Sequence, residues 1–209
     1  MTFGYQGKPH WRDMSDYLVH LTESTDRLLS IVENHWIAPA FLGAVAKHPH
    51  REKLPDQTSC CLSEIPLDHL GRLADRHGWY GVGFSKDFIR SRSGTRVWYL
   101  DDEVELAKWL FESRRTGWFM EPDPADPIWR LTPFIDYVTS NHHFEWEREW
   151  RVLGGLSFES ANVGFLFGPE GEHVDLLARL DLTVPIVDPS WDDPDQVQAA
   201  FAPLPPGGT

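Results

Sequence analysis

Charged and aromatic side chains gather between Phe144 and Leu153, where the sequence reads FEWEREWRVL. Acidic residues alternate there with tryptophans, a period of two that is typical of a β-strand or of the approach to one. The functional interpretation is that the strand presents one carboxylate into a cleft, as acid–base chemistry requires, while its charged neighbours hold it. The structural interpretation is an edge strand with cross-strand ion pairs. The residues alone leave both open.

Two other groups of side chains are suited to binding a ligand. His20 and Thr22 lie two residues apart and offer an imidazole and a hydroxyl to a ribose or an amide. Tyr80 begins a segment with glycines at positions 81 and 83, which leave one face of a strand bare where a flat ring can stack. Ser63 ends another apolar segment. A structural histidine and close sheet packing are the alternatives, and they also stay open.

The histidines and carboxylates from His142 to Glu149 are residue types that bind metals. They lack the HExxH spacing, and the period of two favours a strand over the helix on which that motif lies. Cys60 and Cys61 lie in an apolar segment, where thiols stay inert, and the sequence has no GxSxG motif. We therefore expect no metal site and no serine or cysteine nucleophile.

Composition restricts the classes of partner. With 32 acidic and 19 basic side chains, the 209 residues carry a formal charge of −13, which disfavours a protein whose main role is to hold a phosphate backbone. Nucleic acid stays open only as a transient substrate of a local patch at Arg90, Arg92 and Arg96. Adjacent cysteines bridge poorly, which favours a reducing cytoplasm. The sequence predicts neither a signal peptide nor a membrane span.

The candidate residues lie on short predicted elements. Besides the alternation at 144–153, strand patterns cover residues 17–22, 59–65, 79–84, 96–100, 163–167 and 182–187. Helical patterns cover a capped helix ending at Asn34 and residues 67–77, 85–92, 103–114 and 174–179, while residues 128–140 fit a helix or an extended lead-in. This mixture predicts an α+β fold with a mixed, largely antiparallel split sheet of about six or seven short strands and flanking helices.

The same patterns predict the domain organisation. We expect a single domain over residues 1–188 and an acidic tail rich in proline and glycine over residues 189–209. Composition and length are sufficient for one domain with a proper core.

The order of the motifs resembles that of abortive phage infection proteins of the AbiG type, in the family called AbiGi. The resemblance covers Tyr17–Phe167 and rests on HLT, on CLSEIPLDHL with GWYGVGFSKDF, and on FEWEREWRVLG. More distantly, the layout resembles ADP-ribosyltransferases of the DarT kind, which have an HxT-type first strand and a glutamate on a late strand. His20, Thr22 and Glu149 match that pattern.

The second resemblance implies an ADP-ribosyltransferase-like fold with NAD as a co-substrate. Cleavage of the nicotinamide bond develops positive charge on the ribose, and a nearby carboxylate stabilises it. By the resemblance, Glu149 is the catalytic acid, Glu147 is its fallback, and Arg151 on the same strand face keeps the acid ionised.

The resemblance also assigns cofactor-binding residues. His20 and Thr22 hold the ribose, Tyr80 stacks on the nicotinamide, and Ser63 is grouped with them. We therefore expect a cytoplasmic effector, or toxin, of a phage-defence or toxin–antitoxin system, acting as an ADP-ribosyltransferase or NAD glycohydrolase. Its acceptor would be a protein or a nucleic acid, and its partner a cognate antitoxin or a phage protein, with no membrane involved. The alternative is a non-catalytic binding module that acts as an antitoxin or phage sensor.

Overall fold

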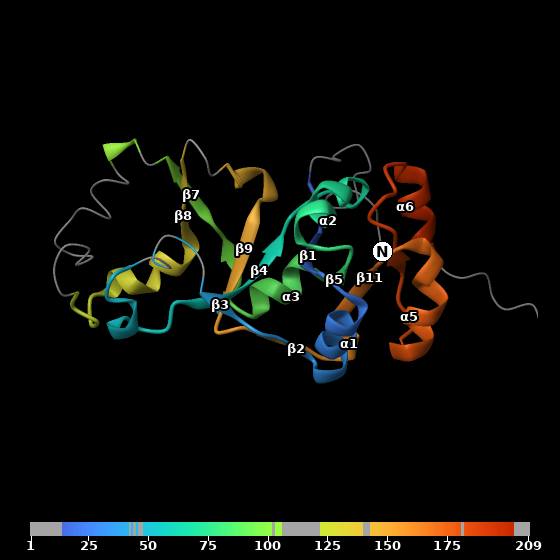
Figure 1. Ribbon diagram of the computed structural model, residues 1–209, viewed down its shortest axis with the longest axis horizontal. Coiled ribbons are helices and arrows are strands. Elements are labelled where there is room, and N and C mark those ends of the chain that lie inside the picture. The colour runs from blue at the N-terminus through green and yellow to red at the C-terminus, as the bar shows by residue number, and fades with distance from the viewer. Residues whose placement is uncertain are drawn as a thin grey trace, which may run out of the picture. The chain divides into compact units, whose positions relative to one another are not determined.

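The structure, a computed structural model, describes residues 14–41, 43, 45, 48–101, 103–105, 122–139, 143–180 and 182–202. The chain divides into two compact units, unit 1 with residues 1–36, 63–88 and 158–209, and unit 2 with residues 37–62 and 89–157. Their strands and helices are shown in Figure 1. The α+β fold with a largely antiparallel sheet is confirmed.

The sheet strands of unit 1 follow the order β12-β11-β5-β1. They are β1 (Tyr17–Thr22), β5 (Tyr80–Ser85), β11 (Val163–Phe167) and β12 (Ile186–Val187). β5 is antiparallel to both β1 and β11, whereas β12 runs parallel to β11. The predicted strands 17–22 and 163–167 are confirmed at both ends, while strand 182–187 is reduced to its last two residues.

Helices of unit 1 begin and end where the sequence places caps. α1 (Thr25–Asn34) starts after Ser24, whose hydroxyl accepts a hydrogen bond from the Arg27 amide. A short 3-10 helix over Leu67–His69 leads into α2 (Gly71–His77), which ends at Gly78 with a φ of 109°. The further helices of unit 1 are α5 (His173–Leu180) and α6 (Pro194–Ala200). Helix α3 (Lys86–Ser91) begins in unit 1, and its residues from Ile89 onward are counted in unit 2.

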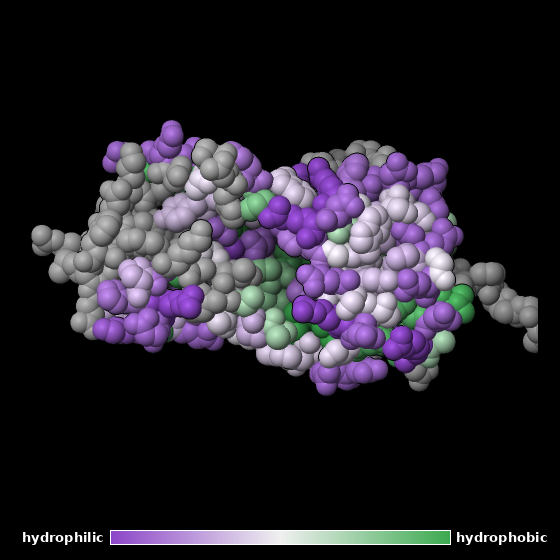
Figure 2. Space-filling model, in the orientation of Figure 1, coloured by the Kyte–Doolittle hydropathy of each residue, from purple (hydrophilic) through white to green (hydrophobic). Residues whose placement is uncertain are grey.

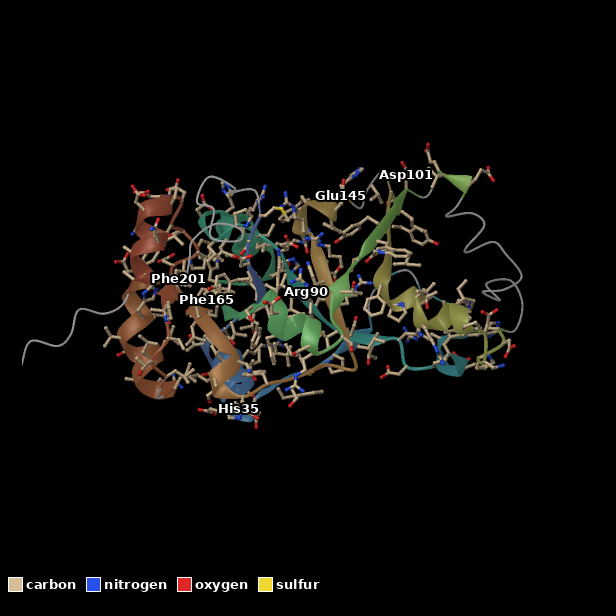
Figure 3. All side chains as sticks on the ribbon, turned by 180° about the vertical axis from the view of Figure 1, so that it is seen from behind. His35, Arg90, Asp101, Glu145, Phe165 and Phe201 are labelled. Carbon is tan, nitrogen blue, oxygen red and sulfur yellow. The ribbon has the colours of Figure 1, made fainter. Side chains whose placement is uncertain are left out.

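The last helix closes the aromatic core of unit 1. Phe201, which follows α6, lies 5.4 Å from Phe165 between ring centroids, and the two labelled rings lie side by side in Figure 3. Tyr17 packs edge-on against Phe165 at 5.5 Å. Val197 of α6 is fully buried. α6 therefore lies within the predicted tail over residues 189–209, and it contributes to the core.

The glycines of β5 make room for the neighbouring strand. A Cβ atom at Gly83 would overlap the Phe165 ring, and one at Gly81 would overlap the Phe167 ring and the His20 carbonyl oxygen. Both phenylalanines belong to β11 and are fully buried. The face that the sequence leaves bare is thus covered by the protein's own aromatic rings.

Replacing Gly83 by alanine is expected to lower the free energy of unfolding by about 1–3 kcal/mol, because the added methyl group overpacks the core. Gly171→Ala is the matched control, since nothing lies within 4 Å of a Cβ atom there. Urea unfolding of the two variants measures the difference. Equal unfolding midpoints would show that the strand can move away from Phe165.

Unit 2 contains short strands of three sheets. In the first, β4 (Thr58–Ser63, with Ser63 counted in unit 1), β9 (Glu149–Leu153) and β6 (Thr95–Arg96) follow each other in that order, and β3 (Ala40–Phe41) pairs with β4. In the second, β7 (Trp98–Asp101) runs parallel to β8 (Ile135–Val138). The third joins β2 (Trp36–Ile37, with Trp36 counted in unit 1) and β10 (Leu156–Ser157).

Several sequence-predicted elements of unit 2 differ from the structure. The single strand predicted over 96–100 is wrong, because β6 and β7 belong to different sheets and are separated at Val97. Residues 128–140 contain 3-10 turns at Pro127–Arg130 and Thr132–Phe134 before β8. Most of the helix predicted over 103–114 lies outside the described residues.

Candidate functional site

The FEWEREWRVL segment becomes a strand only in its second half. Glu145–Glu147 forms a 3-10 turn, and Arg148 has a φ of 47°, which turns the chain into β9 at Glu149. Because successive side chains of a strand point to opposite faces, Glu149 and Arg151 share one face and Trp150 lies on the other. This strand therefore carries two separate clusters.

Arg151 is the centre of the first cluster. Its guanidinium holds Glu149 with two hydrogen bonds, from Nε and from Nη2, each of 2.9 Å. Nη2 also donates to Asp136 at 2.7 Å, and Nη1 donates to the Pro133 carbonyl at 2.7 Å. The Arg151 side chain is 1% exposed, against 14% and 17% for Glu149 and Asp136. The predicted pairing of Arg151 with Glu149 is confirmed.

The electrostatics of this cluster favour a fixed arginine charge. Burial by itself lowers the pKa of the Arg151 guanidinium, but the hydrogen bonds and charge of Glu149 outweigh it and raise the pKa. Burial, followed by the Glu149 charge, raises the pKa of the Cys61 thiol and of the Tyr99 phenol. Both groups therefore stay protonated and neutral at neutral pH.

Glu149 is thus placed as a partner of Arg151. Both of its carboxylate oxygens accept a hydrogen bond from the guanidinium. Glu147, its predicted fallback, is buried in the 3-10 turn before the strand. The geometry supports a structural role for these charges, which hold strands and loops of unit 2 together. The predicted edge strand is wrong, because β9 lies between β4 and β6.

Three predicted cofactor-binding residues share one face of the sheet in unit 1. Thr22 lies directly opposite Tyr80, and His20 lies opposite Val82, on the antiparallel pair β1 and β5. Thr22 is buried, while His20 and Tyr80 are half-buried. The Tyr80 hydroxyl donates a 2.9 Å hydrogen bond to Glu172. NAD binding by these residues stays a prediction.

Ser63, Glu147 and Glu149 do not lie on the sheet face that carries His20, Thr22 and Tyr80. Ser63 is opposite Val19 of β1, so by strand alternation it lies on the other face from His20 and Thr22. Glu147 and Glu149 belong to unit 2, whereas the four predicted cofactor-binding residues belong to unit 1. The structure therefore groups three of the six predicted residues on one face of a sheet.

A second buried ion pair was not found by sequence reasoning. Lys86 Nζ donates to Glu64 at 2.6 Å, and the two side chains are 4% and 1% exposed. Both residues lie in the motif blocks CLSEIPLDHL and GWYGVGFSKDF. The signal available in the sequence was a charged residue directly beside each apolar strand, where burial is unusual unless the charge is paired.

Among the described residues no group of three or more histidine, cysteine and acidic side chains is arranged to hold a metal ion. In the same part of the chain, each helix is too short or too polar to cross a membrane.

Comparison with known proteins identifies the family. The family described as "Putative abortive phage resistance protein AbiGi, antitoxin" matches residues 54–170, which is more than half of the 209 residues. The chain belongs to the AbiGi family. The matched region contains both buried ion-pair clusters. No curated protein and no solved structure shows a significant match to the chain.

The family corrects the functional prediction. The resemblance to AbiGi is confirmed, but the expectation of an NAD-dependent toxin is wrong, because the AbiGi family is described as an antitoxin. That description agrees with the alternative of a non-catalytic antitoxin. The likeness to DarT and to the ADP-ribosyltransferase fold stays a prediction.

Proposed function

We propose that this chain is the antitoxin of an abortive-infection system and acts by binding a cognate partner protein. The observation that carries the proposal is the AbiGi family match over residues 54–170. The structure supports a non-catalytic role, because both carboxylate oxygens of Glu149, the predicted catalytic acid, accept hydrogen bonds from Arg151.

The surface of the described residues offers apolar side chains to a protein partner. Trp36, Trp79 and Val174 of unit 1 are 42%, 37% and 81% exposed, and Trp98 and Leu131 of unit 2 are 60% and 50% exposed. Figure 2 shows hydrophobic surface at the position of α5, beside hydrophilic areas. Exposed tryptophans are side chains that protein interfaces favour.

Co-expression with the toxin of the same abortive-infection system tests the proposal. Expression of that partner alone is expected to slow growth, and co-expression of this chain is expected to restore it. The two proteins should also elute together in size-exclusion chromatography. A partner that stays toxic, or that elutes separately, would argue against the antitoxin function.

Glu149→Gln distinguishes the antitoxin from the enzyme. A Glu149→Gln variant that is folded is expected to restore growth on co-expression, because the carboxylate has a structural role. Its unfolding midpoint shows whether it is folded. The parent protein is expected to release no nicotinamide from NAD. If the parent protein released nicotinamide and a folded Glu149→Gln variant did not, the chain would be an enzyme and the antitoxin proposal would be wrong.

A further inference from the structure

The segment from Arg90 to Trp98 concentrates positive charge on the surface of unit 2. It reads RSRSGTRVW and contains no acidic residue. Its exposed side chains are Arg90, Ser91, Arg92, Ser93, Thr95, Arg96 and Trp98. Guanidinium and hydroxyl groups are the donors that proteins most often present to phosphate oxygens. We call these exposed residues the arginine turn.

Backbone contacts fix the arginine turn at both ends. At the end of α3 the Ser93 amide donates to the Arg90 carbonyl at 3.0 Å, and the Gly94 amide donates to Ile89 at 2.9 Å. A Cβ atom at Gly94 would overlap Ile89, so the turn packs closely on the core. Beyond it, the Val97 amide donates to the Glu149 carbonyl at 2.9 Å. The turn is therefore held in one shape before a ligand binds.

Trp150 positions two of the arginines. The guanidinium carbons of Arg90 and Arg96 lie 5.7 and 5.4 Å from the centre of its ring, within the range of cation–π attraction. Arg96 is also the direct cross-strand partner of Trp150, and the ring is 4% exposed. Figure 3 labels Arg90 on α3. Fixing the guanidiniums in advance lowers the entropy that binding costs.

The acidic residues of the chain lie mainly in unit 1. Unit 1 has 18 acidic and 7 basic side chains, and unit 2 has 14 and 12, so unit 1 carries −11 of the formal −13. Within unit 2, Glu149 lies on the other face of β9 from Trp150, and Arg151 holds both Glu149 and Asp136. The charge of −13 therefore does not by itself exclude an anion at this turn.

We propose that the arginine turn binds single-stranded nucleic acid, with the guanidiniums on the phosphates and Trp98 stacked on a base. Trp98 is 60% exposed and lies two residues beyond Arg96. Proteins that bind single strands without sequence preference combine a basic track with aromatic platforms. An acidic polypeptide would satisfy the guanidiniums but has no regularly spaced flat rings for the indole.

Fluorescence anisotropy of the full-length chain with labelled oligonucleotides of about 15 nucleotides, oligo-dT and oligo-rU, tests the proposal. Binding is expected at low salt, and the logarithm of the association constant should fall against the logarithm of salt concentration with a slope of about −2 for three phosphate contacts. The DNA and RNA arms show whether the sugar matters. The assay needs no partner protein, so its result is independent of the antitoxin function.

Variants of the exposed residues give the sharpest result. Trp98→Ala is expected to weaken binding by about fivefold or more and Trp98→Phe to restore most of it, because base stacking is lost and regained. Arg92→Gln, which leaves the Trp150 contacts in place, should make the salt slope shallower by about 0.7. Arg130→Gln, also exposed and in unit 2, is the control of equal charge.

Three results would overturn the proposal. The first is an absence of salt-dependent binding to both oligonucleotides. The second is equal binding by Arg92→Gln, Trp98→Ala and the Arg130→Gln control, with circular dichroism showing that all are folded. The third is equal competition by polyglutamate of similar length, which would assign the turn to an acidic polypeptide.

Discussion

Arg151→Met is expected to lower the free energy of unfolding by about 3–5 kcal/mol, since it removes one partner of a buried ion cluster. The Glu149 and Asp136 carboxylates would remain, 14% and 17% exposed, without the guanidinium that holds both. Urea unfolding followed by circular dichroism measures the loss. Arg130→Met, an exposed arginine of the same unit, serves as the control and should change the free energy by less than about 0.5 kcal/mol. A loss in Arg151→Met no larger than that of the Arg130→Met control would contradict a structural role for the cluster.

Lys86→Met is expected to have a loss of similar size in unit 1, about 3–5 kcal/mol. The variant leaves the Glu64 carboxylate, 1% exposed, without the ammonium group that lies 2.6 Å away. The double variant Glu64→Leu with Lys86→Met should recover much of the loss, because an apolar pair of similar volume needs no compensating charge. Thermal unfolding of the single and double variants tests this.

Arg76→Met, at an exposed position of α2, is the matched control for Lys86→Met. Surface ion pairs contribute about 0–1 kcal/mol, so this control should stay close to the parent. If the double variant proves as unstable as Lys86→Met alone, the loss comes from the shape of the site and not from an uncompensated charge.

Local sequence signals predicted unit 1 more closely than unit 2. The strand at Tyr17–Thr22, the Ser24 cap and the Gly78 stop of α2 depend on neighbouring residues, and all three are confirmed. In unit 2 the run after Gly94 reads as one strand, yet Val97 separates two strands that pair with distant partners. Pairing over long distances in sequence carries no local signal.

The candidate site was difficult to predict because its side chains also come from segments that are distant in sequence. Sequence spacing correctly put Glu149 and Arg151 on one strand face, but Asp136 and the Pro133 carbonyl, which complete the cluster, come from another segment. Without these partners the carboxylate resembled a catalytic acid. The glycines at 81 and 83 were also predicted to leave space for a ligand, but the rings of Phe165 and Phe167 occupy that space.

The end of the β4-β9-β6 sheet also bears on self-association. β6 is the last strand in that order and has only two residues, Thr95 and Arg96, both exposed. A long apolar strand at such an edge offers backbone groups to other copies of the chain and promotes aggregation, whereas a short strand with a positive charge discourages it. The short strand with its arginine therefore discourages strand pairing between copies of the chain at this edge of unit 2.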